Sequence, residues 1–564
     1  MKNIKDHTVN AFFATLFFVA TAFFFSPLNV HYINIAHFDF TASQVVIYLV
    51  VMCLVMTFLV TKAVSFFGNK MVECVVVLLL ALGILVWLQA NIVPWDYGML
   101  DGSEIDWQGK KLYGYLDSAM WILGIALTFW QRKRFYKNAK TIAVAFILIQ
   151  GIFLAITIGG APHEPSFKNY KVLEDQKYVF SAEQNVMVIV LDAFQTDIFN
   201  ELISDNPNFK TVFDGFTYYR NALSGFPTTY PSVPFIMTGQ FYENKIPIQD
   251  FIQEVYMNDS LPKVLNENDY EVNLYPIKNT VFYDEKIADN FKKRSSIFIN
   301  TREFLRFLTA DIFKISPHFL KRFVYDGITK KQTEKSVSDQ FFDFLEGVKT
   351  ASVNTESDEK VFKYYHLVGI HPPLLINENL ETEQMEINRK NIKRQGTAML
   401  KAMGIFIENL KKLEIYDKSM ILIIADHGFG TEIDPSLYGN GVRDSKNVEA
   451  RKRALAIPLV LVKPLNSTGK LQTSDAPVSL IDVPITIFRA LKIDGNFVGK
   501  SILEMKENES RTRRFLFFDW KHEYWKLEKR YLPPMEEYFV TGFSWLDSSW
   551  INKGNSLIPP TINQ

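Results

Sequence analysis

The sequence predicts two parts of different fold class. The first is a bundle of five transmembrane helices, and the second is an α/β domain with a mainly parallel central sheet, helices on both faces and a small C-terminal β-rich element. Of the 564 residues, 48% are hydrophobic, and most of the apolar excess lies in the first 160. After residue 184, short β-branched runs alternate with amphipathic stretches, which is typical of a sheet buried on both faces.

Five apolar runs support the membrane part, and each is close to the roughly 20 residues that a helix needs to cross a bilayer. They lie at about 10–27, 43–61, 71–93, 114–130 and 141–159. Charged residues fall almost entirely between them. A soluble helical domain is excluded because a run such as 75–88 is apolar on every face. A cleaved signal peptide would explain only the first run.

Basic residues predict the orientation of the spans. They precede the first span and follow the second and the fourth, at Lys2, Lys5, Lys62, Lys70, Arg132, Lys133, Arg134, Lys137 and Lys140. The alternate connections, 31–43 and 95–117, carry few or mainly acidic charges apart from Lys110 and Lys111. The positive-inside rule then places the N-terminus in the cytoplasm and everything beyond residue 160 outside. We expect aromatic and basic residues of the 95–117 connection to contact this exported half.

Charge and cysteine content narrow the function classes. With 61 basic and 61 acidic residues the formal charge is zero, so the chain shows no electrostatic footprint for nucleic acid. The only cysteines, Cys53 and Cys74, lie in the second and third spans, so the exported half has no disulfide and must be stabilised by its core and by bound metal. Segment 161–184 is expected to be a linker, 185–505 the α/β domain and 506–564 its β-rich extension.

Three strands of the predicted sheet end in metal-ligand residues. The apolar runs of strand length are 185–191, 364–370, 420–425 and 457–462, and amphipathic stretches at 394–413 and 479–491 lie between and after them. Asp192 follows the first run, His371 the second, and Asp426 with His427 the third. Singly, each has an ordinary explanation, such as an aspartate that caps the next helix. Ligand sites of such sheets lie beyond the carboxyl ends of the strands, so together these residues indicate one site.

A loop with three prolines and a glycine, residues 224–234, displays two further candidates, Thr228 and Thr229. Its composition excludes helix interior and central strand, so the hydroxyls stand on an irregular, stiffened backbone near the surface. Nucleophiles are usually displayed there, although hydroxyls of this kind also cap helices.

These motifs resemble the alkaline phosphatase and sulfatase superfamily, and the likeness covers roughly 185–505. The segment 423–428, IIADHG, is similar to the metal-binding Asp-His-Gly of that superfamily. Segments 410–428, 453–458 and 482–491 resemble the approach to that motif and the later strand and helix.

Two registers of the family select Thr229 over Thr228 as the nucleophile. In sulfatases the catalytic residue is followed by x-Pro-Ser, as Thr229 is here. In phosphoethanolamine transferases the catalytic threonine stands five residues before a Ser-Val-Pro proline, which corresponds to Pro234. The common sulfatases instead oxidise a cysteine or serine to formylglycine and usually carry an arginine four residues on, where this chain has Val233. Threonine cannot yield that aldehyde, so the resemblance implies phosphoryl chemistry.

The resemblance implies a metal site formed by Asp192, Thr229, Asp426 and His427. Three oxygens and one nitrogen suit Zn²⁺ or Mn²⁺. Such an ion lowers the pKa of a threonine hydroxyl and orients it for in-line attack, so a covalent phospho-threonine intermediate is expected. We expect one tightly bound divalent ion, since the second-metal aspartate of many relatives is missing near Met403.

The five-span anchor followed by an exported domain resembles the phosphoethanolamine and phosphoglycerol transferases of bacterial envelopes. It implies a multi-pass protein of the bacterial inner membrane, with a membrane phospholipid as donor and an envelope glycan or lipid as acceptor. His366 and His371 are similar to paired histidines of those transferases that attend the substrate phosphate or a second ion. Two departures are that Asp192 stands where they have glutamate, closer to the phosphodiesterase branch, and that 434–443 lacks their further histidine.

Other candidates and alternatives stay open at this stage. Lys278 and Asn279, after a strand-like run, are candidate phosphate contacts, although a solvated turn is the simpler explanation. The aromatic segment 517–531 suggests a hairpin with one buried face, and His522 within it has no assigned role. A membrane-bound phosphodiesterase or other phosphate or sulfate ester hydrolase, and a non-catalytic envelope protein, are the alternatives to a transferase. The head group, the acceptor, the metal and the oligomeric state are not determined by the sequence.

Overall fold

The computed structural model divides the chain into two compact units. The membrane unit comprises residues 1–164 and 295–336, and the sheet unit comprises residues 165–294 and 337–564. The chain therefore passes between the units three times. The structure describes residues 2–35, 38–93, 95–97, 105–161, 164–294, 299–326, 330–354, 359–434, 448–520 and 531–560.

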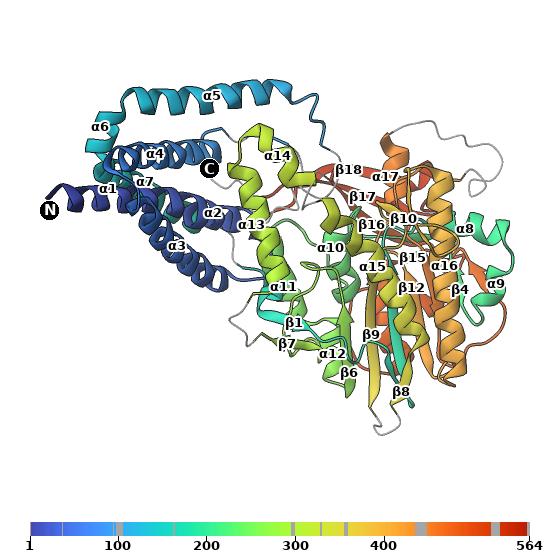
Figure 1. Cartoon of the computed structure of the whole chain (residues 1–564). Coiled ribbons are helices and arrows are strands. Elements are labelled where there is room, and N and C mark those ends of the chain that lie inside the picture. The colour runs from blue at the N-terminus through green and yellow to red at the C-terminus, as the bar shows by residue number, and fades with distance from the viewer. Residues whose placement is uncertain are drawn as a thin grey trace. The chain divides into compact units, whose positions relative to one another are not determined.

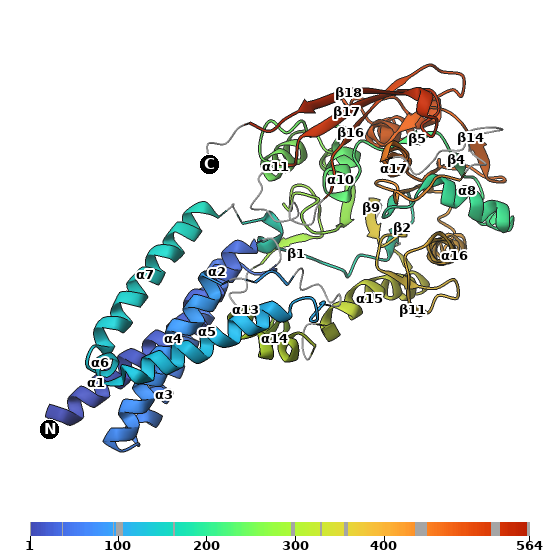
Figure 2. The same ribbon diagram turned by 90° about the horizontal axis from the view of Figure 1, so that it is seen from above.

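The membrane unit contains five helical spans long and apolar enough to cross a bilayer, which confirms the predicted number. Figure 1 and Figure 2 show them as long helices that run side by side over much of their length. The helices of this region are α1 (Lys2–Ala20), η1 (Thr21–Phe25), α2 (Ser26–Ile33), α3 (Ala42–Ser65), α4 (Asn69–Asn91), α5 (Lys111–Trp130), α6 (Arg132–Lys137) and α7 (Ala139–Gly160). Their contacts bury two apolar clusters, one around Val45 and Leu49 and one around Val76 and Leu80.

The first span is longer than predicted and reaches Ile33. It changes from α-helix to one turn of π-helix at Thr21–Phe25 and back again. Pro27 follows this turn, and because proline has no N–H and its ring clashes with the preceding turn, the local change to wider hydrogen bonding relieves the clash.

Two helices that lie far beyond the fifth span in sequence belong to the membrane unit. Helices α13 (Thr301–Ile315) and α14 (His318–Val324) follow the strand β7 (Phe291–Lys293) in sequence, yet they contact α2 and α5. The alternation of apolar and amphipathic segments beyond residue 184 did not predict that these two helices leave the sheet unit. The 95–117 connection was expected to contact the catalytic domain, but Tyr97 and Ile105 pack against Phe313 and Tyr325, which belong to the membrane unit.

The sheet unit is built on a seven-stranded sheet of order β14-β4-β13-β12-β3-β9-β6. Its strands are β3 (Asn185–Leu191), β4 (Thr217–Tyr219), β6 (Tyr270–Tyr275), β9 (Lys360–Leu367), β12 (Ser419–Ile424), β13 (Val460–Lys463) and β14 (Gln472–Ser474). Strands β12, β3, β9 and β6 are mutually parallel, whereas β13 is antiparallel to both of its neighbours. The mainly parallel sheet is thus confirmed, with one reversed strand that the apolar pattern alone did not reveal.

Helices cover both faces of this sheet, as predicted. Alternate residues of β3 belong to different cores: Val188 packs with one cluster and Ile189 with the other. The first face carries α10 (Thr229–Thr238), α11 (Ile248–Asn258), α12 (Leu261–Asn266) and α18 (Val483–Leu491). The second carries α8 (Thr196–Asp205), α9 (Phe209–Val212), α15 (Lys330–Lys349) and α16 (Arg389–Lys412).

Smaller sheets complete the unit. The C-terminal β-rich element is a three-stranded antiparallel sheet of β16 (Thr512–Phe517), β17 (Met535–Thr541) and β18 (Trp550–Leu557). The remaining elements are β1 (Tyr170–Val172), β2 (Val179–Ser181), β5 (Ala222–Leu223), β8 (Ser352–Asn354), β10 (Leu374–Ile376), β11 (Thr382–Met385), α17 (Val448–Ala456) and β15 (Val478–Ser479). The predicted linker 161–184 needs correction, because β1 and β2 pair with β7 and β8 and Phe167 is buried in the core.

Candidate active site

The carboxyl ends of three adjacent parallel strands form the floor of the site. In β12, β3 and β9, Ile424 pairs with Val190, and Val190 pairs with His366. Asp192 stands one residue beyond the end of β3, and Asp426 stands two residues beyond the end of β12. The sheet register therefore brings Asp192, Asp426 and His366 to one edge, as expected for a ligand site in a parallel sheet.

The backbone around Asp192 is held by a tight turn and by a close neighbouring loop. Ala193 has a positive φ of 57°, so the chain turns sharply directly after the carboxylate. A Cβ on Gly369 would lie 2.1 Å from the carbonyl oxygen of Asp192, so only glycine allows the loop after β9 to pass there. Hydrogen bonds from Asp192 N to Leu367 O and from Ile370 N to Asp192 O, both 3.0 Å, join the two segments.

Thr229 is the first residue of α10, and its hydroxyl faces the aspartate. Thr229 Oγ1 lies 3.5 Å from each carboxylate oxygen of Asp192 and 3.4 Å from Nε2 of His427. The N–H groups in the first turn of a helix have no intrahelical acceptors and carry partial positive charge, which favours a bound anion. The predicted nucleophile thus stands where a phosphoryl or sulfuryl group would be stabilised.

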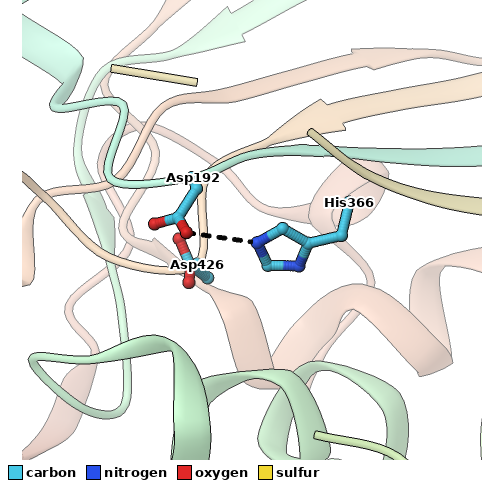
Figure 3. Close-up of side chains that lie close together, drawn as sticks. All are labelled: Asp192, His366 and Asp426. Carbon is cyan, nitrogen blue, oxygen red and sulfur yellow. Dashed lines mark ion pairs between the residues drawn. The ribbon is translucent and has the colours of Figure 1, made fainter. Parts of the chain in front are cut away.

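The four predicted metal-site residues and His366 form one cluster. His427 Nε2 lies 3.6 Å from Asp192 Oδ1 and 3.6 Å from Asp426 Oδ2. His366 Nε2 lies 3.5 Å from Asp192 Oδ2, and Figure 3 shows this imidazole pointing at the two carboxylates. In the neutral ring of His427, Nδ1 donates to Gly428 O at 2.7 Å, so Nε2 presents its lone pair to the cluster.

The charges of this cluster fit a divalent cation. Asp192 is 5% exposed and Asp426 is fully buried, and within the described residues neither forms an ion pair with a lysine or arginine. Asp426 Oδ1 accepts hydrogen bonds from the N–H groups of Ala193 and His427, whereas Oδ2 has no hydrogen-bond partner. Two buried carboxylates without a cationic partner are unfavourable unless an ion joins them. Ligand atoms of Asp192, His366 and Asp426 lie within 4.8 Å of one another, close enough to share one ion.

The neighbouring imidazoles favour the ionised form of Asp192. Burial alone would raise the pKa of this carboxyl, but electrostatic attraction to the imidazoles of His371, His366 and His427, together with a hydrogen bond from His366, outweighs burial and holds the pKa below its usual value. An ionised carboxylate is the form that binds a metal ion.

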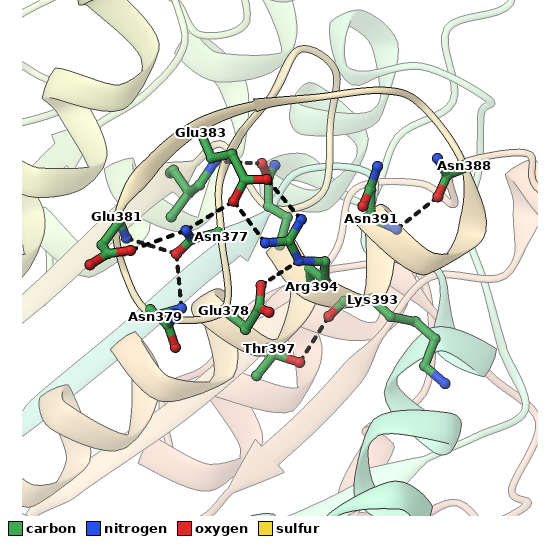
Figure 4. Close-up of polar contacts among 12 residues, drawn as sticks. Asn377, Glu378, Asn379, Glu381, Glu383, Asn388, Asn391, Lys393, Arg394 and Thr397 are labelled. Carbon is green, nitrogen blue, oxygen red and sulfur yellow. Dashed lines mark hydrogen bonds and ion pairs between the residues drawn. The ribbon is translucent and has the colours of Figure 1, made fainter.

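His371 lies on an exposed loop that the rest of the unit holds firmly. Its Nδ1 is 2.6 Å from the carbonyl oxygen of Pro372, so Nε2 is the free nitrogen of the neutral ring. The buried side chain of Gln395 in α16 donates to Gly369 O at 3.0 Å and accepts from the N–H groups of Leu375 and Ile376. The following hairpin is tied to the same helix by Arg394, whose guanidinium pairs with two glutamates (Figure 4).

A cavity of about 660 Å³ opens above the cluster. Polar or catalytic-type side chains in its lining include Asp192, Thr228, Thr229, Gln340, His366, His371, His427 and Arg451. Apolar side chains such as Leu367, Phe429 and Phe517 form much of the rest. The lining includes Ile277 but, among the residues described, neither Lys278 nor Asn279, so the structure does not bring these two candidates into the site. His522 and most of the segment 521–531 lie outside the described residues.

Sequence reasoning missed several residues that shape the site. Tyr364 is buried, and its hydroxyl lies 3.0 Å from Nδ1 of His366. This contact follows from the two-residue period of a strand, which puts residues 364 and 366 on one face, and was therefore available from the sequence. Gln395 and Arg451 offered no local signal, because only the folded chain brings Gln395 of α16 to the His371 loop and Arg451 of α17 to the cavity lining.

Comparisons with known proteins agree with this fold. The profile of the sulfatase family, described as "Sulfatase", matches residues 184–493. One similar solved structure is that of Ps i-CgsB in complex with k-i-k-neocarrahexaose, which is 15% identical in sequence. The match covers 66% of this chain and 86% of the Ps i-CgsB chain, with a TM-score of 0.41. Another is the lipoteichoic acid synthase LtaP from Listeria monocytogenes, which is 15% identical. The match covers 68% of this chain and 88% of the LtaP chain, with a TM-score of 0.38.

The phosphonate monoester hydrolase SpPMH from Silicibacter pomeroyi is also 15% identical, with coverages of 64% and 87% and a TM-score of 0.38. A search of curated proteins found no match. Because the family profile covers more than half of its residues, the chain belongs to the sulfatase family, part of the alkaline phosphatase superfamily. It is an enzyme of sulfatase-like phosphoryl or sulfuryl transfer or hydrolysis, and enzymes of this family use a divalent metal ion.

Proposed function

We propose that the protein transfers a phospholipid head group, phosphoethanolamine or phosphoglycerol, onto an envelope glycan or lipid through a covalent intermediate on Thr229. The observation that carries the proposal is the Thr229 hydroxyl at the start of α10, within 3.5 Å of a buried carboxylate and an imidazole. Five apolar spans join this site to a membrane, where a phospholipid donor is available at high local concentration. The predicted orientation puts the site outside the cytoplasm.

The first half-reaction forms a bond between Thr229 Oγ1 and the phosphorus of the donor and breaks the bond from phosphorus to the diacylglycerol oxygen. The hydroxyl proton passes to the Asp192 carboxylate, both of whose oxygens lie 3.5 Å from Thr229 Oγ1. His371, which lines the same cavity, is the proposed proton donor to the leaving oxygen. In the second half-reaction the acceptor hydroxyl loses its proton to His371 and attacks phosphorus. The bond from phosphorus to Oγ1 breaks, and the Asp192 carboxyl returns its proton to Thr229.

Asp192, Asp426 and His427 are the proposed metal ligands, with His366 as a further ligand or as the base that orients Asp192. When bound, Zn²⁺ or Mn²⁺ would lower the pKa of the threonine hydroxyl and neutralise the phosphoryl oxygens. Asp426 Oδ2 has no hydrogen-bond partner, and in the described part of the cluster no lysine or arginine pairs with it; both observations support this assignment.

Threonine at the nucleophile position favours phosphoryl over formylglycine-dependent sulfate chemistry. Oxidation of Thr229 would give a ketone, because its Cβ carries a methyl group, and the hydrated aldehyde of the common sulfatases is thus inaccessible. Hydrolysis of a phosphodiester remains the second candidate, because Asp192 stands where the envelope transferases have glutamate. The two functions differ only in whether the intermediate is discharged by an acceptor or by water.

The test is intact-mass analysis of the full-length protein in nanodiscs of phosphatidylethanolamine and phosphatidylglycerol with Zn²⁺ or Mn²⁺. We expect a phosphoethanolamine or phosphoglycerol adduct on Thr229 and release of diacylglycerol. An adduct that persists in buffer and is discharged by an added glycan or lipid acceptor identifies a transferase. An adduct that turns over in water alone identifies a hydrolase.

A matched pair of variants locates the adduct. Thr229→Val should abolish it, whereas Thr228→Val should retain it, because Thr228 makes no contact with the acidic cluster among the described interactions. Loss of the adduct in both variants, or in neither, would contradict the assignment of Thr229.

A further inference from the structure

Residues 299–326 return from the exported half to the membrane unit. Phe307 of α13 is fully buried and packs edge-on against Phe38 and Phe40, with ring centroids 5.1 and 5.4 Å apart. These two phenylalanines lie in the connection between the first and second spans. The insert, defined here as α13 and α14, is therefore a packed part of the helix bundle.

Buried polar contacts fix each helix of the insert to a span. Ser26 Oγ in α2 donates to Asp311 Oδ1 in α13 at 2.5 Å. Asp117 in α5 is 1% exposed and accepts from His318 N of α14 at 2.6 Å. A Cβ on Gly114 would lie 2.7 Å from the His318 ring, so glycine lets α14 approach α5 closely.

The outward face of the insert is apolar. Its exposed large side chains are Leu305 (53%), Ile312 (40%), Phe319 (60%), Leu320 (42%) and Phe323 (77%). Residues 305 and 312 are seven apart on α13, and 319 and 323 are four apart on α14, so each pair shares one helix face. Contiguous exposure of this kind is rare on surfaces that face water.

We infer that this face of the insert lies in the interfacial region of the phospholipid bilayer, as a second membrane contact made by the exported half. The surface continues the lipid-facing surface of the bundle: α14 packs on the start of α5, where Leu112 and Tyr115 are 65% and 73% exposed. At about 1.5 Å per residue, the 15-residue α13 is about 22 Å long, too short for a hydrocarbon core of about 30 Å. It therefore lies along the interface, as amphipathic helices do.

The contacts of the insert also agree with a location on the outer side. The insert packs against Phe38 and Phe40 of the first connection and against Tyr97 and Ile105 of the connection before α5. Both connections were predicted to lie on the side opposite the N-terminus, the same side as the chain beyond residue 160. Arg322, 68% exposed beside Phe323, can reach lipid head groups while its neighbour contacts acyl chains.

Site-directed spin labelling tests the inference. Full-length protein with Cys53→Ala and Cys74→Ala receives one nitroxide at Phe323→Cys or Leu305→Cys in nanodiscs of phosphatidylethanolamine and phosphatidylglycerol. Leu123→Cys, 67% exposed within a span, is the lipid reference, and Lys245→Cys, 76% exposed in the sheet unit, is the water reference. We expect the oxygen-to-nickel collision ratio at 323 and 305 to exceed the water reference several-fold and approach the lipid reference.

Two results would overturn the inference. A ratio equal to that of Lys245→Cys would show that the face is in water. Suppression of both collision rates would show that protein, such as a second copy of this chain, covers it. Each variant must retain the thermal unfolding temperature of its cysteine-free parent, and Phe319→Cys replaces a position that fails this control.

Discussion

Two buried carboxylates in the sheet unit, Asp482 and Asp426, differ in whether an arginine neutralises them. Asp482 is fully buried, and Arg511 donates to both of its oxygens, at 2.6 and 2.7 Å, while N–H groups of Ser479 and Lys500 complete its hydrogen bonds. Asp426 is equally buried, but its neighbours are a histidine, an aspartate and two backbone N–H groups, and its Oδ2 has no hydrogen-bond partner.

The difference separates a structural acid from a functional one. A buried carboxylate whose countercharge belongs to the chain is permanently satisfied, so its role is to stabilise the fold. A buried carboxylate that lacks such a partner is stabilised by a cation from solution, and at Asp426 such a cation would lie beside Thr229. The comparison predicts that metal stabilises the Asp426 site and has no effect on the Asp482 site. It also predicts that removing a charge destabilises the Asp482 site but not the metal-free Asp426 site.

The largest expected effect is on catalysis. Thr229→Val removes the proposed nucleophile and should lower diacylglycerol release about 10³-fold or more, as loss of a nucleophile does in other hydrolases. Metal content and thermal unfolding should stay near those of the wild type, since the carboxylates remain. Measured turnover in Thr229→Val equal to that in Thr228→Val would remove Thr229 from the mechanism.

The next largest effect is expected on the stability of the fold when the ion pair of Arg511 and Asp482 is broken. Arg511→Met leaves Asp482 buried without its cation and should destabilise the protein by about 3–5 kcal/mol. Thermal unfolding in detergent, with and without Zn²⁺ or Mn²⁺, is the measurement, and the metal should not restore the loss. The double variant Arg511→Met with Asp482→Asn is the control and should recover part of it. Rescue of Arg511→Met by metal would erase the distinction between the two sites.

Metal removal should lower the stability of the protein by an intermediate amount, through the Asp426 site alone. At a metal concentration about 100 times the dissociation constant, binding stabilises the folded state by about 2.7 kcal/mol, which a chelator would remove. Asp426→Asn should abolish this response and, without metal, be at least as stable as the wild type, because a buried uncompensated charge is gone. The unfolding temperature with and without metal measures the stability of each form, and the amount of metal bound per chain measures binding. A full metal response in Asp426→Asn would exclude Asp426 as a ligand.

The smallest effect is expected where ion pairs face solvent. Arg394 pairs with Glu378 and Glu383, but the three side chains are 25%, 38% and 42% exposed (Figure 4). Arg394→Gln should therefore barely lower the unfolding temperature, and lower it less still at high salt. A loss as large as that of Arg511→Met would show that burial does not decide the strength of these pairs.

Much of the fold was predictable because its signals are local. Each span contains a long, mainly apolar run, and β3 and β12 are apolar strands in which every residue is buried. Asp192 and Asp426 could be anticipated because each directly follows such a run. Local pattern could not show that β13 runs antiparallel or that α13 and α14 leave the sheet unit, since both depend on contacts distant in sequence.

The sequence by itself determined which residue types can bind a metal and attack a phosphoryl group, and roughly where the membrane spans lie. Only the tertiary structure decided that His366 joins Asp192, that Gly369 lets the His371 loop pass, and that Lys278 stays out of the cavity lining. The physical reason is that strand register and loop packing are fixed by many weak long-range contacts, and a shift of one residue turns a side chain to the opposite face of the sheet.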